Sequence, residues 1–517
     1  MRKNLGKKMT AVITAAAMAM CMTACGGNTG ATTGGTDSGA STTTTDGGAD
    51  TATTDDGAAT TDDGAATTDD GAATDDGAAD ADVEPYTVMT DADGNPYDLG
   101  GIEVVIRDWW SNPDDSFLTN PKNDYDDARK EYVEWAMEKY NFKVVQQQIS
   151  DWGSTPADFV DYVTSGGDDT NYVWIIRDSA EIAQAMSTGL MYDLSKIDFL
   201  DFNDPIFTAN KVHEQYTYKG GIYAMYMGTA EPRGGFFINK DIVGDDLVNQ
   251  IYDAQADGTW DWDMFKSILD QVQKDTDNDG TNDIWGVTGN TGGWALMFAA
   301  SNGGDFVGNS DDGYVYRLED ANTIEGINFM VDLLNNYYMP RPEDAQWDYY
   351  KEEFKSGTVA FCENGGTYPA YPGGEFSDVS FPMAYVMTPK GTSATGQITN
   401  IWSNNPTAIP SCYDDDRAWK CAFAYYIYNS APAGYEDYNG YVEQLKTADV
   451  IDERAIEETV PMACSAEHGT VSYSGMIPGL EVGPQLAWNI GPGADVTAAI
   501  EAVHESWNTF IDTANGK

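Results

Sequence analysis

Basic residues are scarce in this chain. Its 517 residues include 28 Lys and Arg against 84 Asp and Glu, which gives a formal net charge of −56. A surface with this balance offers no cationic patch, so we expect no nucleic-acid partner and no direct binding to an anionic membrane surface. Hydrophobic residues still make up 41% of the sequence, which is enough for a sizeable folded core.

Sequence motifs of common enzymes are also missing. The chain has no Gly-x-Ser-x-Gly elbow and no phosphate-binding loop, and His213-Glu214 lacks the second histidine of a zinc-protease helix. Beyond residue 25, the cysteines are Cys362, Cys412, Cys421 and Cys464. They show no C-x-x-C spacing, so no zinc site is indicated, and they are either buried thiols or disulfide partners. Since no nucleophile is paired with a base, we expect no enzyme.

The first 24 residues have the pattern of an export signal. Basic residues at positions 2, 3, 7 and 8 precede an apolar run at 9–24, which is too short for a comfortable membrane span. The run ends in Met-Thr-Ala before Cys25 and resembles a bacterial lipobox, in which cleavage leaves a lipid-carrying cysteine at the new N-terminus. An ordinary signal peptide with an incidental cysteine is the alternative, and both predict export.

Large apolar residues are absent from 26 to 82. This stretch consists mainly of Thr, Asp, Gly, Ala and Ser, and it repeats TTDDGAA from positions 53, 60 and 67. A seven-residue period without apolar positions cannot form a coiled coil. We therefore predict that residues 25–82 are a disordered, self-repelling tether that is lipidated at Cys25.

Beyond residue 85 the sequence pattern changes and predicts alternating strands and helices. Buried strands are predicted at 100–108, 142–149 and 172–176, with amphipathic helices at 126–140 and 179–187. This alternation indicates an α/β fold with a parallel sheet, in which ligands bind at the carboxyl ends of the strands. The residues expected there are Asp108, Trp109, Trp110, Arg177 and Asp178.

The order of segments resembles a known family. The segments that carry the resemblance are DLGGIEVVIRDWWS (98–111), STGLMYDLSKI (187–197), YKGGIYAMYMGTAEPRGGFFINKDIV (218–243), AASNGGDFV (299–307), FKSGTVAFCENG (354–365) and TAAIEAVHESWNTFIDTANG (497–516). Together they resemble the extracellular solute-binding proteins of carbohydrate ABC transporters, the maltose-binding-protein-like group. The resemblance covers nearly all of residues 97–517.

The resemblance implies a two-lobed periplasmic-binding-protein-like fold with a ligand cleft between the lobes. It places 97–230 with 398–475 in lobe 1, and 231–397 with 476–517 in lobe 2. It implies hinge closure around the ligand, a monomer, and the permease subunits of an ABC importer as partners. Lipidated members of the family belong to Gram-positive bacteria. We expect the receptor on the extracellular face of the membrane, held by its N-terminal lipid.

A cleft for sugar should place tryptophan beside polar groups, because the apolar C–H faces of sugars stack on aromatic rings. Trp110, Trp152, Trp294 and Trp402 are flanked by polar or small residues near strand ends or lobe crossings. We expect about half of them to contact ligand, and the rest to be packing residues. Glu231 in the crossing segment and Glu363 after the strand TVAFC are candidates to bind sugar hydroxyls. Hinge ion pairs are the alternative for these two glutamates.

An aspartate-rich loop, DTDNDGTNDIWG at 275–286, has the spacing of a calcium site. Aspartates occupy positions 1, 3, 5 and 9, glycine occupies position 6, and position 7 offers a backbone carbonyl. The predicted ligands are Asp275, Asp277, Asp279, Thr281 and Asp283. Position 12 lacks the usual glutamate, so the loop is not an EF-hand. An acidic turn without an ion is the alternative; we predict structural Ca²⁺, away from the cleft.

These features predict a lipid-anchored extracellular receptor that binds a sugar or oligosaccharide and delivers it to an ABC importer. One alternative is an extracellular glycan-active enzyme, since a carboxylate pair is easily found among 84 acids. Turnover of oligosaccharides would favour it. A glycan-binding surface protein without a transporter is the other, although such a protein has no need of the hinge-like segment at 218–243.

Overall fold

The computed structural model describes residues 84–177, 179–310, 313–402 and 405–517. Every helix and strand of these residues lies within Tyr86–Lys517. The signal segment, Cys25, the tether and Asp178 lie outside the described residues. The four cysteines that are described form no disulfide. Among the described residues, no helix is long and apolar enough to cross a membrane.

The first sheet has four strands in the order β13-β3-β1-β2. Their bounds are β1 (Ile102–Asp108), β2 (Phe142–Gln148), β3 (Asn171–Ile175) and β13 (Thr407–Ala408). β1 pairs in parallel with both β2 and β3, while β13 runs antiparallel to β3. Alternating side chains of β1 bury Val104 and Ile106, as the period of a strand requires. The three strands predicted here are confirmed to within two residues.

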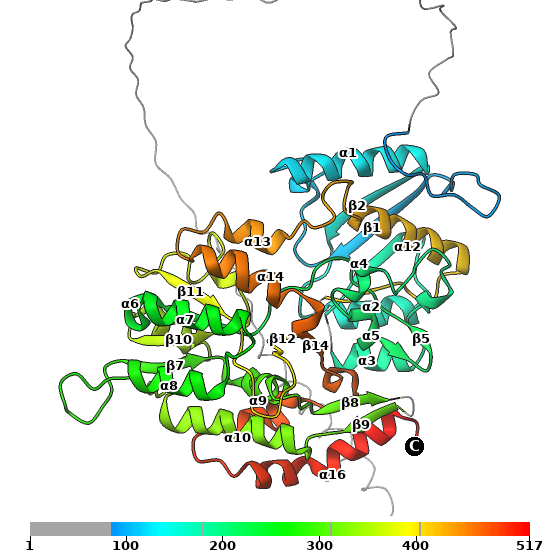
Figure 1. Ribbon diagram of the computed structural model, residues 1–517. Helices are drawn as coiled ribbons and strands as arrows, with labels where there is room; N and C mark the ends of the chain where they lie inside the picture. The colour runs from blue at the N-terminus through cyan, green and yellow to red at the C-terminus, as the bar shows by residue number, and fades with distance from the viewer. Residues whose placement is uncertain (1–83, 178, 311–312, 403–404) are drawn as a thin grey trace, which may run out of the picture. The chain divides into compact units, whose positions relative to one another are not determined.

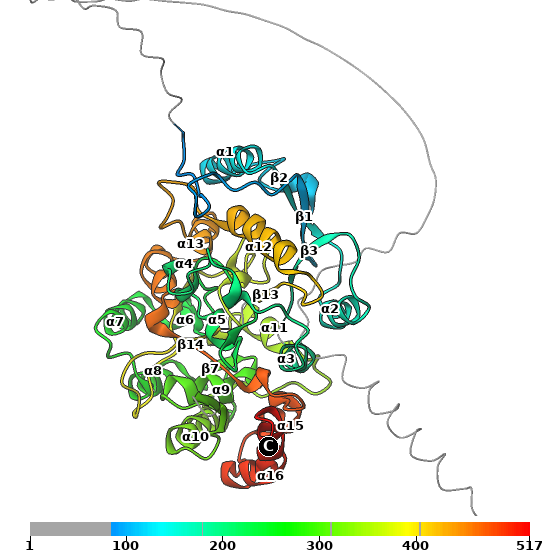
Figure 2. The ribbon, with the colours of Figure 1, turned by 90° about the vertical axis from the view of Figure 1, so that its right-hand side faces the viewer.

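Helices and a short hairpin surround the first sheet. Their bounds are α1 (Asp124–Lys139), α2 (Thr155–Thr164), α3 (Ala180–Ser187), α4 (Pro205–Thr208), α5 (Val212–Gln215), α12 (Asp415–Asn429), β4 (Thr217–Tyr218) and β5 (Gly221–Ile222). α1 begins where the Asn123 side chain accepts a hydrogen bond from the backbone N–H of Asp126. α12 packs across β1, β2 and β3 (Figure 2). Its residue Phe423 is fully buried.

The second sheet has the order β11-β6-β10-β7. Its strands are β6 (Phe236–Asn239), β7 (Trp285–Gly289), β10 (Val359–Glu363) and β11 (Met383–Val386). β10 is parallel to β7, and β6 runs antiparallel to β10 and β11. The start of β6 therefore lies at the same edge as the ends of β7 and β10. The segment that leads into β6 reaches this carboxyl edge.

The second sheet carries most of the remaining elements (Figure 1). They are α6 (Lys240–Val243), α7 (Asp245–Ala256), α8 (Trp262–Val272), α9 (Thr291–Ser301), β8 (Val307–Ser310), β9 (Gly313–Tyr316), α10 (Ala321–Asn336), α11 (Tyr349–Lys355), α13 (Gly440–Leu445), α14 (Val460–Ala463), α15 (Val482–Gln485) and α16 (Val496–Ala514). α10 packs against α9 and α16. Trp260, Trp294 and Trp507 are fully buried among these elements. The prediction of an α/β fold is confirmed.

The chain passes from the first sheet to the second before β6 and returns between β11 and β13. The return contains β12 (Asn400–Trp402), which pairs in parallel with β14 (Gly469–Val471). A third crossing follows α12, after which Ile451 bridges to Met383 and Asp452 forms an ion pair with Lys240 at 3.0 Å. The structure thus packs this stretch against the second sheet, whereas the predicted lobe boundary of 398–475 groups it with the first. The remaining boundaries stay predictions.

Candidate functional site

The parallel strands of each sheet end at the same edge, which is the carboxyl edge of that sheet. In the first sheet Asp108 of β1 pairs with Gln148 of β2 at that edge, and β13 starts there because it is antiparallel to β3. In the second sheet Glu363 at the end of β10 pairs with Gly289 at the end of β7. The predicted ligand-binding residues follow these strand ends or lie in the crossing segments, so the topology brings them to two edges.

Asp108 is fully buried and organises the loop after β1. Its Oδ1 accepts hydrogen bonds from the backbone N–H groups of Trp110 (3.1 Å) and Ser111 (3.0 Å). Its Oδ2 accepts from Gln146 Nε2 at 2.7 Å and from the Ser111 hydroxyl. Because the protein already supplies four donors, Asp108 acts here as a positioning residue for the loop.

The two tryptophans after β1 have different environments. Trp109 is partly buried against the core of the first sheet. Trp110 is 50% exposed, and its ring meets Trp109 edge to face at 4.8 Å between centroids. Trp109 thus supports Trp110, which presents its ring to solvent as a stacking platform must.

Trp152 and Arg177 join the ends of β2 and β3. Trp152 is 41% exposed, and the Arg177 guanidinium carbon lies 4.6 Å from its ring centroid. Arg177 Nε also donates to the Trp152 carbonyl at 3.0 Å. A cation over an aromatic face fixes the ring and places a hydrogen-bond donor beside it. The structure therefore brings these two predicted residues together.

Trp294 was a candidate for ligand contact, but it lies in the core around the second sheet and is not an exposed ring. It is fully buried, and its ring meets Phe298 and Tyr338 edge to face. Its Nε1 donates to Glu363 Oε2 at 3.1 Å, and Gly365 N–H donates to Oε1 at 2.6 Å. Burial raises the pKa of Glu363 to about 7. Glu363 and Trp294 therefore stabilise the end of the strand and do not face solvent. The glycines that precede Trp294 in the sequence gave no indication that its ring would be buried.

Glu231 lies in the first crossing segment and forms an ion pair with Arg233 at 2.8 Å. The side chains are 24% and 37% exposed, respectively. Burial raises the pKa of Tyr371, and the negative charge of Glu231 adds a smaller contribution in the same direction. The hinge ion pair considered for Glu231 is present, and its partial exposure leaves both groups accessible to a ligand.

Trp402, one of the four tryptophans considered as ligand contacts, lies at the end of β12. Its backbone pairs with Val471 of β14. Its side chain lies outside the described part of the chain, as does Asp178. Their roles stay predictions.

Sequence reasoning missed three exposed rings. Among the described residues, the exposed large hydrophobic side chains are Trp110, Ile149, Trp152, Val315, Trp347, Tyr368 and Trp488. Tyr368 follows the end of β10, and Trp488 lies against Gly292 just after β7. Trp347 meets Trp488 edge to face at 5.6 Å between centroids. Trp347 and Trp488 come from segments far from the strand ends in sequence, so only the tertiary fold identifies them.

The aspartate loop connects α8 to β7 and lies at the amino end of β7. Carboxylate oxygens of Asp275, Asp277 and Asp283 lie within 4.8 Å of one another. A bridge between Lys274 and Ile284 closes the loop. Asp279 is not part of this cluster; its Oδ1 accepts from the Thr281 N–H at 2.7 Å. Three convergent, mostly exposed carboxylates are a donor set that suits Ca²⁺.

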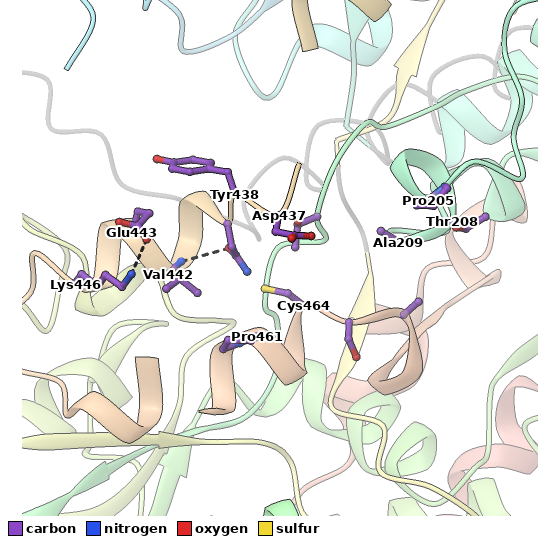
Figure 3. Close-up of a pocket in the computed structure, with 14 residues that line it drawn as sticks. Pro205, Thr208, Ala209, Asp437, Tyr438, Val442, Glu443, Lys446, Pro461 and Cys464 are labelled. Carbon is purple, nitrogen blue, oxygen red and sulfur yellow. Dashed lines mark hydrogen bonds and ion pairs between the residues drawn. The ribbon is translucent and has the colours of Figure 1, made fainter. Parts of the chain in front are cut away.

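A pocket of 610 Å³ is lined by none of the predicted ligand-binding residues (Figure 3). Its walls come from α4, from Thr229 of the crossing segment and from residues 437–466 around α13 and α14. The Asn439 side chain caps α13, and Glu443 pairs with Lys446 at 2.7 Å. The pocket thus lies where elements of both sheets meet the crossing, and it contains no exposed tryptophan.

Comparisons with known proteins agree with this architecture. The family model described as bacterial extracellular solute-binding protein matches residues 131–438, which is more than half of the chain. No curated protein sequence matches the chain.

Solved structures are similar over most of their length. UgpB from Mycobacterium tuberculosis, in complex with glycerophosphocholine, has a TM-score of 0.50 and 17% identity, covering 79% of this chain and 98% of that one. The GacH receptor of Streptomyces glaucescens, solved unliganded and with acarbose, has a TM-score of 0.49 and 15% identity, covering 80% and 99%. The maltose/maltodextrin-binding domain of Bdellovibrio bacteriovorus, bound to maltotriose, has 0.45 and 13%, covering 79% and 100%. The likeness to UgpB shows the fold, and the predicted two-lobed architecture is confirmed.

Proposed function

The chain belongs to the bacterial extracellular solute-binding proteins, and from this premise we propose that it binds a sugar or oligosaccharide at the carboxyl edges of its two sheets. One observation carries the proposal. Of the seven large hydrophobic side chains exposed among the described residues, five are aromatic rings. Trp110, Trp152 and Tyr368 follow strand ends, Trp488 lies against Gly292 just after β7, and Trp347 meets Trp488. Exposed aromatic rings that concentrate at the carboxyl edges of sheets are typical of a binding surface.

The polar groups at these edges suit sugar hydroxyls. Arg177 places donors beside the exposed Trp152 ring. The partly exposed pair of Glu231 and Arg233 offers both acceptor and donor atoms in the crossing segment. A site with aromatic surfaces and a few oriented polar groups binds a neutral, hydroxyl-rich ligand without requiring net charge.

We further propose that the protein delivers this sugar to the permease subunits of an ABC importer. Cys25 would carry the lipid and residues 25–82 would be the tether, so that a monomeric receptor stays on the extracellular face of a Gram-positive membrane. The lipobox-like sequence before Cys25 and the family membership support this role. Replacing Cys25 with Ala should stop incorporation of labelled fatty acid and release the receptor into the medium. Fatty-acid labelling that persists in the variant would contradict the anchor.

We also propose that the loop from Asp275 to Asp283 binds structural Ca²⁺. Asp275, Asp277 and Asp283 already converge. The like charges of the three carboxylates repel one another, and a divalent cation reverses that sign. The loop lies at the amino end of β7, so this ion would support the second lobe and take no part in sugar binding.

A thermal-shift panel of sugars tests the proposed binding. A ligand that binds only the native state raises the melting temperature by mass action, so at least one sugar should shift it in a concentration-dependent way. Calorimetric titration then gives the affinity, and chromatography of the same samples should show the sugar unchanged. Hydrolysis would support the glycan-active enzyme. If no sugar shifts melting and none is hydrolysed, the proposed function is wrong.

A further inference from the structure

Trp347 and Trp488 form an exposed aromatic pair that the proposed function does not require. Their exposed fractions are 51% and 46%, and their rings cross at 68°. Trp347 comes from the connection between α10 and α11, and Trp488 follows α15. Two exposed indoles from segments this far apart in sequence leave a large apolar surface in water. Such a surface is expected where a ligand covers it.

Gly292, in the first turn of α9, gives the pair its position beside β7. A Cβ atom at Gly292 would lie 3.2 Å from Trp488 Nε1, so a larger residue there would press on the indole. Asn290 caps α9 by accepting from the Gly292 N–H at 3.3 Å. Its own N–H donates to the Glu363 carbonyl at 3.3 Å. Backbone contacts thus join the aromatic pair to the carboxyl edge of the second sheet.

The same edge continues to the crossing segment. A Cβ at Gly366, three residues after Glu363, would lie 2.6 Å from the Pro232 carbonyl oxygen. Pro232 stands between the ion-paired Glu231 and Arg233. The residues of this edge therefore form a row, which runs from the crossing segment, past the ends of β10 and β7, to the Trp347–Trp488 pair.

The length of this row determines how many sugar units a ligand needs in order to contact both of its ends. β6, β10 and β7 are consecutive neighbours, so the two strand spacings add up to roughly 10 Å. The Trp347–Trp488 pair lies at the β7 end of that span. A single pyranose that touches the crossing cannot also stack on this pair, whereas an oligosaccharide can lie along the edge and reach both.

We propose that the Trp347–Trp488 pair is an outer sugar-binding subsite, which makes this receptor prefer oligosaccharides to the corresponding monosaccharide. The inference rests on the proposed sugar-binding function and adds a length requirement to it. Units near Glu231 and Arg233 bind through hydroxyl groups, and the distal unit binds by stacking on an indole.

Chain-length series test this subsite. The probes are glucose, mannose and xylose with their linear oligomers up to the hexamer, and binding is measured calorimetrically on the full-length protein. For the series that binds, affinity should rise with length until the distal subsite is filled. The double variant Trp347→Ala with Trp488→Ala should lose that rise, by about tenfold or more for the longer oligomers, because hot-spot rings contribute at this level. The shortest sugar that binds should keep its wild-type affinity.

Ring-retaining variants separate stacking from folding. Trp347→Phe with Trp488→Phe should restore most of the length dependence, and all variants should melt near the wild-type temperature. Wild-type protein that binds a monosaccharide as tightly as its oligomers would overturn the inference and leave the proposed function intact. Equal weakening of short and long sugars by the alanine variant would also overturn it. If no sugar of any length binds, the proposed function itself fails.

Discussion

The carboxyl edges of the two sheets expose aromatic rings by different means. At the first sheet, the exposed rings Trp110 and Trp152 directly follow β1 and β2, and a buried carboxylate and a guanidinium fix them. At the second sheet, the tryptophan that follows β7, Trp294, is buried against Glu363. Exposed indoles reach this edge from distant segments instead. Position after a strand therefore does not distinguish a binding platform from a core residue; burial does.

The strongest test of this contrast removes the buried ring. We expect Trp294→Ala to lower the free energy of unfolding by about 3–5 kcal/mol, because it leaves a cavity and removes the hydrogen-bond donor of Glu363 Oε2. Denaturant unfolding measures the loss. Sugar affinity, measured well below the melting temperature, should change little. A stable variant that no longer binds sugar would place Trp294 in the site and erase the contrast.

The exposed ring of the first edge should behave in the opposite way. Trp110→Ala should weaken sugar binding by about 2–4 kcal/mol, the size of a hot-spot truncation, and leave the melting temperature nearly unchanged. Calorimetric titration gives the affinity, and Trp110→Phe, which keeps a ring, is the matched control. Unchanged affinity in Trp110→Ala would mean that this ring does not contact the sugar.

Calcium sharpens the contrast between the two ends of β7. Asp275→Asn with Asp277→Asn should abolish any rise in melting temperature with free calcium, because it removes two of three convergent carboxylates. Asp257→Asn, an exposed change outside the loop, should keep the rise. Identical melting of the wild type in calcium and in chelator would show that the loop is only an acidic turn. Loss of sugar binding on chelation, with the protein still folded, would place the ion in the site.

The smallest expected effect concerns a second buried carboxyl near the edge of the second sheet. Burial raises the pKa of Glu353 from 4.5 to about 7, and its Oε2 accepts from the Thr288 hydroxyl at 2.8 Å. The folded state thus binds a proton that the unfolded chain releases, so this group makes the free energy of unfolding fall as pH rises from about 4.5 to 7.

Glu353→Gln removes that proton equilibrium. The variant should lose less stability than the wild type between pH 4.5 and 7, measured by thermal melting across the range. Glu352→Gln, an exposed neighbour on α11, is the control and should follow the wild type. A pH profile that Glu353→Gln leaves unaltered would mean that Glu353 titrates as an exposed acid does.

Periodicity was sufficient to predict the first three strands and two helices, because each buries one regular face. It was also sufficient to place Trp110, Trp152 and Arg177 at strand ends. The sequence could not show that Asp108 has four protein donors, since Gln146 comes from the neighbouring strand. Nor could it reveal Trp347 and Trp488, because their proximity depends on how α15 and the connection before α11 fold against α9.

A crystal structure of Tyr86–Lys517 in complex with the sugar that gives the largest thermal shift tests the central claim most directly. We predict sugar density at the strand-end edges, with a ring stacked on Trp110 or Trp152 and hydroxyls bonded to Glu231 or Arg233. Density confined to the pocket between α4 and Cys464, with the exposed tryptophans of both edges still in solvent, would contradict the account.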